Sequence, residues 1–161
     1  MQSFTCLPLG IPARVYRSTM PFSRRYDPEG KVYQAYQANQ ISTVIMLTSD
    51  AEAMEKSGRD LRSLYIEHGL NVVHLPIDDF GTPSAPQLQN PVEEASQHLE
   101  AGKSIAIHCH AGLGRTGMFS ACLARKVLGM TAEEATTWVK KNIPGSVETP
   151  EQGSMVKNFH S

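Results

Sequence analysis

Short apolar runs alternate along the chain with longer stretches whose apolar residues recur at helical spacing. The runs are residues 42–47, 71–77 and 104–109 (STVIML, NVVHLPI and SIAIHC). Continuous apolar runs of this length are typical of strands that are covered on both faces, as in a parallel sheet. We therefore expect three buried strands in these places.

The stretch between the second and third runs has the pattern of an amphipathic helix. Ser84 and Gln87 form a capping box ahead of it. One face of the helix then carries Leu88, Val92, Ala95 and Leu99. Because proline has no backbone N–H, we expect Pro91 to kink this helix or to delay its start.

Two more helices are predicted after the third run. Residues 116–128 (TGMFSACLARKVL) are apolar almost all round, which is typical of a buried central helix, and Gly129 is a natural residue for its end. A second capping box begins at Thr131 and opens a helix that Pro144 must terminate. We expect Trp138 of that helix to lie in the core. The pattern as a whole is β/α alternation around a central sheet.

Length and charge limit the classes of protein. The 161 residues suffice for one domain, spanning residues 1–161, and leave no room for a second core of similar size. Fifteen Lys and Arg against sixteen Asp and Glu give a net charge of −1, which argues against a general binder of nucleic acid or anionic membranes. The N-terminal part is locally basic, and its cations are Arg14, Arg17, Arg24, Arg25 and Lys31. We expect them to form either a solvated face or a docking surface for an acidic partner.

The cysteines and the chain termini indicate a cytoplasmic protein. Cys6, Cys109 and Cys122 are odd in number and irregularly spaced, which favours a reducing compartment over a disulfide framework. Cys122 lies in the apolar helix and is expected to pack there, while Cys6 could form a regulatory disulfide with an oxidised Cys109. We find no basic leader followed by an apolar run and no run of 18 apolar residues.

Residues 107–117 (IHCHAGLGRTG) carry the most specific chemistry. A strand that ends at Cys109 is followed by a tight loop with Gly112 and Gly114 and then by the start of the central helix. Such a loop points backbone N–H groups inward, where they and the helix dipole attract an anion. Arg115 adds a guanidinium fork that matches two phosphate oxygens. Cys109 at the base of this cup is then a thiolate nucleophile aimed at phosphorus.

This segment resembles the HCxxGxxR[ST]G signature of the cysteine-dependent protein tyrosine phosphatases. Its surroundings, from about residue 44 to 152, resemble the small dual-specificity branch, particularly enzymes of the kinase-associated phosphatase type. The resemblance implies a three-layer α/β fold with a mostly parallel sheet flanked by helices, a phosphocysteine intermediate, and neither a metal nor another cofactor. It also implies that the substrate phosphate binds to the loop residues His110, Ala111, Gly112, Leu113, Gly114 and Arg115.

A general acid must protonate the leaving oxygen when the P–O bond breaks, and the loop PIDDFGTPS offers two candidates. The family loop commonly reads proline, one or two residues, aspartate, often glycine, then proline, which implies that Asp79 is the acid. Spacing alone does not exclude Asp78. Both aspartates could also be ordinary solvated turn residues.

The resemblance implies roles for three further residues. Thr116 stands where the family has a hydroxyl that assists departure of the cysteine sulfur, although it could simply cap the helix. His108 corresponds to a buried histidine that orients the loop and supports the thiolate. Gln152 resembles a late glutamine that positions the hydrolytic water, and it could equally be a surface residue.

The loop side chains narrow the substrate class. His110, Ala111 and Leu113 are not lysines, whereas phosphoinositide-specific relatives commonly carry basic residues there; the Asn-Arg-Tyr phosphotyrosine motif is absent too. We expect a monomeric phosphoprotein phosphatase that acts on phosphotyrosine, with phosphoserine and phosphothreonine as further candidates, and that has a phosphorylated protein, not nucleic acid or membrane, as its partner. The alternatives are a catalytically impaired phosphopeptide-binding module, or the same chemistry on a phosphoinositide or an RNA 5′-phosphate.

Overall fold

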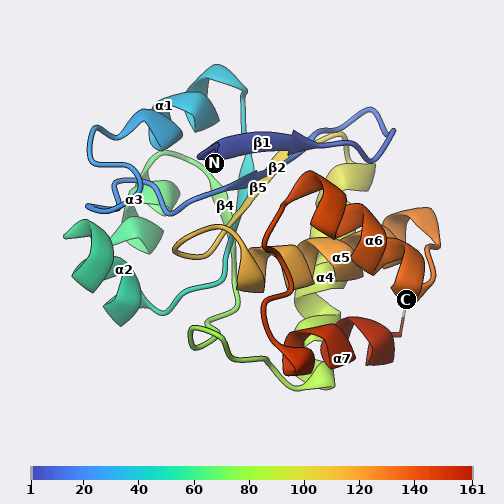
Figure 1. Cartoon of the computed structure of the whole chain (residues 1–161). Helices are drawn as coiled ribbons and strands as arrows, with labels where there is room; N and C mark the ends of the chain where they lie inside the picture. The colour runs from blue at the N-terminus through green and yellow to red at the C-terminus, as the bar shows by residue number, and fades with distance from the viewer. Residues whose placement is uncertain (1, 161) are drawn as a thin grey trace.

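The computed structural model describes residues 2–160, which contain one five-stranded sheet (Figure 1). The strands are β1 (Phe4–Leu7), β2 (Val15–Ser18), β3 (Thr43–Met46), β4 (Asn71–His74) and β5 (Ile105–His108). Their order is β1-β2-β5-β3-β4, and only the pairing of β1 with β2 is antiparallel. The expected mostly parallel sheet is confirmed, with β5 at its centre.

Helices cover both faces of this sheet. They are α1 (Lys31–Ala38), α2 (Asp50–Ser57), α3 (Leu61–Glu67), α4 (Ala85–Glu100), α5 (Gly114–Leu128), α6 (Ala132–Asn142) and α7 (Pro150–Asn158). Figure 1 shows α1, α2 and α3 on one side and α4 to α7 on the other. The three-layer α/β architecture is therefore confirmed. No helix within residues 2–160 is both long and apolar enough to cross a membrane.

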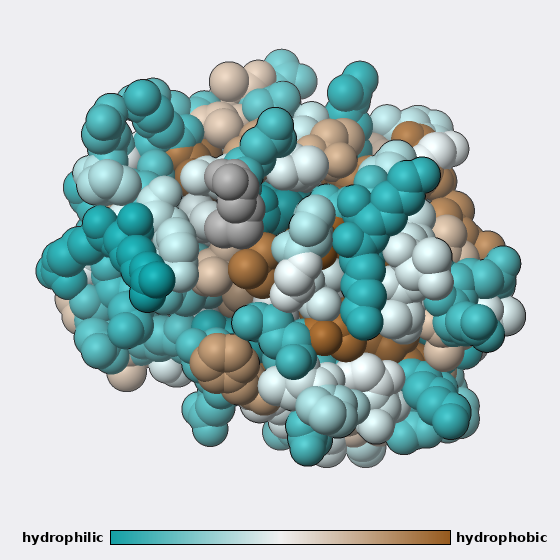
Figure 2. All heavy atoms as spheres, viewed as in Figure 1, coloured by the Kyte–Doolittle hydropathy of each residue, from teal (hydrophilic) through white to brown (hydrophobic). Residues whose placement is uncertain are grey.

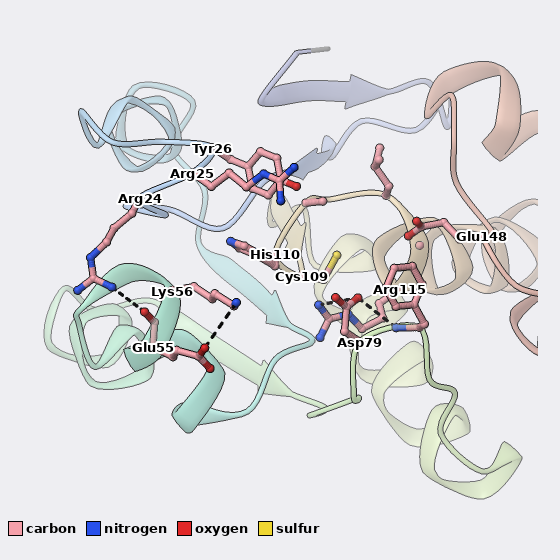
Figure 3. Close-up of a pocket in the computed structure, with 14 residues that line it drawn as sticks. Arg24, Arg25, Tyr26, Glu55, Lys56, Asp79, Cys109, His110, Arg115 and Glu148 are labelled. Carbon is pink, nitrogen blue, oxygen red and sulfur yellow. Dashed lines mark hydrogen bonds and ion pairs between the residues drawn. The ribbon is translucent and has the colours of Figure 1, made fainter.

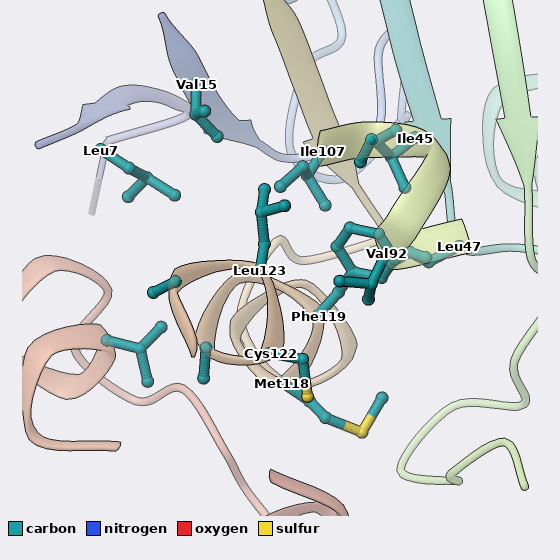
Figure 4. Close-up of a cluster of buried hydrophobic side chains, with 14 of the residues drawn as sticks. Leu7, Val15, Ile45, Leu47, Val92, Ile107, Met118, Phe119, Cys122 and Leu123 are labelled. Carbon is teal, nitrogen blue, oxygen red and sulfur yellow. The ribbon is translucent and has the colours of Figure 1, made fainter. Parts of the chain in front are cut away.

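Alternate residues of the central strands supply two separate cores. Ile45 and Ile107 point toward α4 and α5, where they join Phe119 in the larger apolar cluster (Figure 4). Val44 and Ala106 belong to a second cluster that also contains residues of α1, α2 and α3. Successive side chains of a strand point to opposite faces, so strands that are apolar throughout are buried on both sides. All residues of β3 and β5 are buried, as their continuous apolar pattern predicted.

The strand expected at residues 71–77 is shorter in the structure, and the expectation that it is buried is wrong: it lies at the edge of the sheet, and only Val73 of its four residues is buried. β4 ends at His74, yet the chain still follows β3 beyond that point. Leu75 N–H donates to the Met46 carbonyl at 3.0 Å, and Ile77 N–H donates to the Leu47 carbonyl at 3.1 Å. Pro76 between them has no N–H to contribute.

The capping box expected for α4 is present, and of the two effects expected of Pro91 the delayed start does not occur. The Ser84 side chain accepts from Gln87 N–H, and the Gln87 side chain accepts from Ser84 N–H. The helix begins directly after Ser84 with Pro91 inside it, so the start is not delayed. The two reciprocal bonds of the box fix the first turn ahead of the proline.

The two following helices match their signals closely. α5 begins at Gly114, two residues earlier than expected, and its C-cap is Gly129 with φ of 67°. α6 begins with a capping box at Thr131 and ends at Asn142, before Pro144. Trp138 packs against the larger cluster but is only half-buried, so it lies at the edge of the core and not within it.

The parallel register brings four chain segments to one edge of the sheet. Ser18, His108 and Met46 lie side by side at the ends of β2, β5 and β3, and His74 of β4 continues the row. The loops that follow these residues therefore leave from the same carboxyl edge. Crevices at this edge are the usual binding sites of open α/β sheets.

Candidate active site

A cavity of about 600 Å³ opens at this carboxyl edge (Figure 3). Its walls come from the loop after β2, the C-terminal end of α2, the loop after β4, the loop after β5 with the start of α5, and the segment before α7. The loop after β5 and the first residue of α5 form its base, and these residues, 109–114, are called the phosphate loop below. Cys109 and Arg115 both line the cavity.

Cys109 lies directly after the central strand and is 2% exposed. Its Sγ accepts a hydrogen bond from Thr116 Oγ1 at 3.1 Å. The N-cap position of α5 is Leu113 and makes no side-chain capping bond, so Thr116 does not cap this helix. Thr116 instead directs its hydroxyl at the sulfur from the first turn of α5.

The phosphate loop presents unpartnered backbone donors. Within residues 2–160, no protein acceptor takes a hydrogen bond from the N–H groups of residues 110–113. These donors lie next to the N-terminus of α5, where the helix dipole adds positive potential. Backbone N–H groups in this arrangement match the oxygens of an anion.

Two glycines permit the close packing of this loop. Gly112 has φ of 77°, and a Cβ on it would lie 2.3 Å from Arg17 Nη2 and 2.4 Å from the Ser18 carbonyl oxygen. A Cβ on Gly114 would lie 2.2 Å from Glu148 Oε1. A side chain on Gly112 would collide with the backbone of β2, whereas one on Gly114 would require the end of the Glu148 side chain to shift.

Arg17 supports the phosphate loop from β2, so the expectation of an exposed cation is wrong for this residue, while the other four N-terminal cations are exposed. Its guanidinium is buried and donates to the Gly112 carbonyl through Nε at 3.2 Å and Nη2 at 2.9 Å, and to the Ala111 carbonyl at 3.2 Å. Burial lowers the pKa of Arg17, while the charge of Cys109 acts in the opposite direction. Arg17 thus holds the carbonyls of the loop on the side away from the cavity.

The Arg115 side chain is 2% exposed and is held in one orientation. Nη1 and Nη2 donate to the two oxygens of Glu52 at 2.8 and 2.9 Å, and Nη1 also donates to the Ile77 carbonyl at 2.8 Å. Nε is buried without a hydrogen-bond partner among the described residues. The edge formed by Nε and the second N–H of Nη2 is therefore left as a fork for two oxygens.

Electrostatics keep this guanidinium charged. Burial by itself lowers the pKa of Arg115, but the hydrogen bonds to Glu52 and the charges of Cys109, Glu52 and Asp79 more than offset it, and the net shift is upward.

The two aspartates of the loop after β4 differ in position. Asp79 lines the cavity, and its Oδ1 lies 3.4 Å from Arg115 Nη2, although the side chain is 59% exposed. Asp78 is exposed and does not line the cavity, and its carbonyl accepts from Gly81 N–H at 2.8 Å in a turn. Phe80, which follows Asp79 in this turn, has φ of 61°. The turn therefore directs Asp79, and not Asp78, toward Arg115.

His108 is completely buried behind the cysteine. Its Nδ1 lies 2.9 Å from the Cys109 carbonyl, which only accepts, so Nδ1 carries the proton. Its Nε2 then accepts from the Tyr65 hydroxyl at 2.9 Å. Burial lowers the pKa of His108 to about 4, so the ring is neutral near pH 7. This arrangement fits an orienting residue and not a proton carrier.

His110 connects the phosphate loop to the segment after β2. Its Nε2 lies 2.9 Å from Ser23 Oγ, which itself accepts from the N–H groups of Arg25 and Tyr26. The Tyr26 ring meets the His110 ring edge-on, with centroids 4.9 Å apart. Burial lowers the pKa of His110, and the nearby positive charges of Lys56 and Arg115 add to this effect.

Gln152 is fully buried, so the surface alternative for it is wrong. Its Oε1 accepts from Glu148 N–H at 2.8 Å, and its backbone N–H donates to the Thr149 hydroxyl in the capping box of α7. Its Nε2 has no hydrogen-bond partner among the described residues and lies 3.2 Å from a Cβ position on Gly114. The amide group therefore touches the phosphate loop although Gln152 does not line the cavity.

Sequence reasoning missed several residues of this site. Glu52, Tyr65 and Glu148 carry no local motif, and each reaches the site only because the strands bring distant loops together. Within residues 2–160, no three His, Cys, Asp or Glu side chains are grouped so that they could hold a metal ion.

A family model matches residues 19–127, which is more than half of the chain. Its description is "Tc-R-P: Polymorphic toxin system, DSP-PTPase phosphatase". The match includes the whole phosphate loop and Asp79, and it ends before Gln152.

Curated relatives agree with this match. The chain is 35% identical over 96 residues to protein tyrosine phosphatase domain-containing protein 1 of Danio rerio, covering 60% of this chain and 13% of that protein. It is 30% identical over 157 residues to the dual specificity protein phosphatase CDC14C of Homo sapiens, covering 91% of this chain and 32% of that protein. The chain thus spans only a minor part of the length of these relatives.

Solved structures share the fold along nearly the whole chain. The active form of Tk-PTP is 28% identical, with a TM-score of 0.78, covering 96% of this chain and 95% of that one. Kinase associated phosphatase, solved with serine in place of its catalytic-site cysteine, has a TM-score of 0.84 at 21% identity, covering 95% of this chain and 90% of that one. Together with the family model and the geometry of the phosphate loop, these matches show that the chain belongs to the dual-specificity branch of the cysteine-dependent protein tyrosine phosphatase superfamily.

Proposed function

We propose that this protein is a phosphoprotein phosphatase that hydrolyses phosphotyrosine through a phosphocysteine intermediate on Cys109. The observation that carries the proposal is the juxtaposition around Cys109 Sγ. The sulfur accepts from the Thr116 hydroxyl and lies at the base of a cavity that Arg115 also lines. The unpartnered N–H groups of residues 110–113 and the free edge of Arg115 provide donors for the oxygens of a phosphate group.

In the first step, the Cys109 thiolate attacks phosphorus, so an S–P bond forms and the P–O bond to the leaving group breaks. The phosphate loop and Arg115 bind the three other oxygens and stabilise their charge in the transition state. Asp79 in its acid form donates its proton to the leaving oxygen. The 3.4 Å separation of Asp79 Oδ1 and Arg115 Nη2 supports this role, because Arg115 is the proposed ligand of the phosphate oxygens.

In the second step, Asp79 takes a proton from water, the water oxygen attacks phosphorus, and the S–P bond breaks. Inorganic phosphate leaves, and the Cys109 thiolate returns, stabilised by the Thr116 hydroxyl. We assign to Gln152 the positioning of this water. The assignment is supported by its side-chain Nε2, which has no hydrogen-bond partner among the described residues and lies next to Gly114. A small movement of the side chain would have to bring that amide into the cavity.

Two aromatic residues at the cavity support an aryl phosphate as substrate. Tyr26, in the segment after β2, and Phe80, in the loop after β4, both line the cavity, and Phe80 is 58% exposed. Exposed aromatic rings beside a polar site favour a flat apolar group. Phosphotyrosine also has a better leaving group than phosphoserine or phosphothreonine. These last two remain candidate substrates.

We extend the proposal to the setting in which the protein works. We assign it a phosphorylated protein as partner, with neither nucleic acid nor membrane, a monomeric state and a cytoplasmic location. The three cysteines are free, with Cys109 and Cys122 buried, which fits a reducing compartment.

The decisive experiment is hydrolysis of para-nitrophenyl phosphate at mildly acidic pH with EDTA present. We expect turnover that survives chelation, that Cys109→Ser abolishes, and that phosphotyrosyl peptides also support. The matched control is Cys122→Ser, which alters a buried cysteine in the middle of α5 and leaves the cavity untouched.

Absence of turnover from folded, reduced protein would overturn the proposal. Phosphopeptide affinity of that inactive protein would then identify a binding module. Turnover that EDTA abolishes would also contradict it, because the proposed steps use only residues of this chain.

A further inference from the structure

One wall of the cavity is basic and is built from two separate segments. Arg24 and Arg25 come from the segment after β2, and Lys56 comes from the last turn of α2. All three line the same cavity as Cys109. Figure 3 shows them on one side of Cys109, with Asp79, Arg115 and Glu148 on the other. We call these three cations the basic wall.

Hydrogen bonds fix the two segments of the basic wall against each other. Arg24 N–H donates to the Lys56 carbonyl at 3.0 Å, and Arg24 Nη1 donates to the Glu55 carbonyl at 2.6 Å. Met20 N–H donates to the His110 carbonyl at 2.9 Å, which ties the same segment to the phosphate loop. The backbone of the wall is therefore preorganised beside the phosphate loop.

The inner part of this segment is equally well fixed. The buried Asp27 side chain accepts from Phe22 N–H at 2.9 Å and from Val32 N–H at 3.2 Å. Ser23 Oγ accepts from two further N–H groups and contacts His110. Arg24 and Arg25 are exposed, and Arg24 keeps its other guanidinium nitrogen, Nη2, in addition to the Nη1 that donates to the Glu55 carbonyl.

The charge of the wall is only partly neutralised. Glu55 is the one carboxylate in this wall, and it lies 3.6 Å from Lys56 Nζ. Arg25 lies over the Tyr26 ring at 5.2 Å, and no carboxylate among the described residues pairs with it. Figure 2 shows that mainly hydrophilic side chains cover the surface over α2 and α3. An anionic group that binds there must therefore displace water from these side chains. A net positive wall beside the reaction centre attracts an anionic group of the substrate.

The opposite wall decides between kinds of substrate. Asp79 and Glu148 line that side of the cavity. A ligand with phosphate groups all around it, such as the headgroup of a phosphoinositide, would therefore meet two carboxylates. An extended peptide can instead place an acidic residue against one wall only. The asymmetry of charge thus favours a peptide over a multiply phosphorylated headgroup.

We infer that the basic wall of Arg24, Arg25 and Lys56 is a specificity subsite that binds acidic side chains flanking the phosphotyrosine of a peptide substrate. The inference deepens the proposed function and rests on it. Each cation lies at the surface, so its separate effect is modest and sensitive to salt.

The test compares two phosphotyrosyl peptides that differ only in flanking glutamates or glutamines. We expect wild type to hydrolyse the acidic peptide about tenfold more efficiently, as kcat/KM, at low ionic strength, and to lose most of this preference at high salt. The triple variant Arg24→Gln, Arg25→Gln, Lys56→Gln should bring the ratio to within about twofold. Comparing two peptides on the same enzyme removes any general change in activity.

A second triple variant provides the matched control. Lys103→Gln, Lys140→Gln and Lys141→Gln remove the same charge from exposed positions outside the cavity. This control should retain the preference of wild type. If the first triple variant fails to fold, Arg25→Gln alone decides, because Arg25 is exposed and its guanidinium lies over the Tyr26 ring at 5.2 Å, and it should lower the ratio two- to threefold.

Binding to Cys109→Ser separates this inference from the proposed function. If wild type hydrolyses no peptide but Cys109→Ser binds the acidic peptide more tightly, the subsite stands and the proposed function fails. Equal rates and equal affinities for the two peptides would overturn the subsite. So would an equal loss of preference in the control triple variant, or faster hydrolysis of phosphoinositide vesicles than of the acidic peptide.

Discussion

Glu52 holds Arg115 through both of its carboxylate oxygens, at 2.8 and 2.9 Å. The two residues are 63 positions apart and lie on α2 and α5. The pair uses one N–H of Nη1 and one of Nη2, and it leaves Nε without a hydrogen-bond partner among the described residues, while Asp79 Oδ1 lies 3.4 Å from Nη2. Glu52 therefore determines which edge of Arg115 faces the cavity, although its own side chain binds no substrate in the proposed mechanism.

Glu52→Gln should weaken both the site and the fold. The amide NH₂ group would face a guanidinium that only donates, and one charged bond would be lost. We expect kcat/KM for para-nitrophenyl phosphate to fall about tenfold to a hundredfold, and the free energy of unfolding to fall by about 3 kcal/mol. Kinetics and urea denaturation measure the two effects. Glu67→Gln, an exposed change on α3, is the control, and an equal loss there would contradict this assignment.

The two loop aspartates should differ sharply in their effect on the rate. Asp79 lies 3.4 Å from Arg115 and lines the cavity, whereas Asp78 does not line it. We expect Asp79→Asn to lower kcat about a hundredfold or more, because the leaving oxygen loses its proton donor, and Asp78→Asn to change it less than about threefold. The opposite ranking would show that Asp78 is the acid and would leave the assignment of Cys109 intact.

Thr116→Ala should slow the second step more than the first. The hydroxyl donates to Cys109 Sγ, which is the leaving group when phosphocysteine is hydrolysed. We expect kcat to fall about tenfold and rapid mixing to reveal a burst of nitrophenolate, while Thr116→Ser retains most activity. Ser120→Ala, which removes another buried hydroxyl from α5, should give no burst. A burst in both variants, or in neither, would contradict the role of Thr116.

Local signals in the sequence predicted the elements that surround the phosphate loop. β3 and β5 follow from continuous apolar runs, because strands buried on both faces need apolar residues throughout. The capping boxes at Ser84 and Thr131 are made by residues three positions apart, so sequence shows them directly. The loop motif is local in the same sense.

The elements that sequence did not predict depend on contacts between distant residues. β2 (VYRS) contains Arg17, which reads as a surface residue until the carbonyls of the phosphate loop provide its partners. β1 is an edge strand with the exposed Cys6 in it, so it lacks a continuous apolar run. Glu52 has no signature, because its partner lies on another helix.

Arg17→Lys should test whether this residue shapes the phosphate loop. Lysine keeps the charge but cannot donate to two carbonyls in a fixed fork. We expect inorganic phosphate to inhibit the variant about five- to tenfold more weakly, because the loop N–H groups lose their fixed orientation. Arg14→Lys, at an exposed position just before β2, should leave phosphate inhibition unchanged. Lower thermal stability with unchanged inhibition would mean that Arg17 serves the fold alone.

The buried His108 predicts a specific dependence of stability on pH. Burial lowers its pKa in the folded protein to about 4, from an ordinary value of 6.5. Below pH 6.5 the unfolded chain binds a proton that the folded protein refuses, so the free energy of unfolding falls as the pH drops from 6.5 toward 4. The loss attributable to His108 is about 3 kcal/mol over this range.

His108→Asn isolates this contribution. Asparagine keeps a donor near the Cys109 carbonyl but does not titrate, so the variant should be less stable at pH 7.5 and yet lose less stability than wild type on acidification. Urea denaturation at several pH values between 7.5 and 4 measures the difference in slope. His160→Asn, at an exposed histidine, should retain the wild-type slope. Equal slopes for wild type and His108→Asn would mean that His108 takes up its proton with the same pKa in the folded protein as in the unfolded chain, which would contradict the effect of burial.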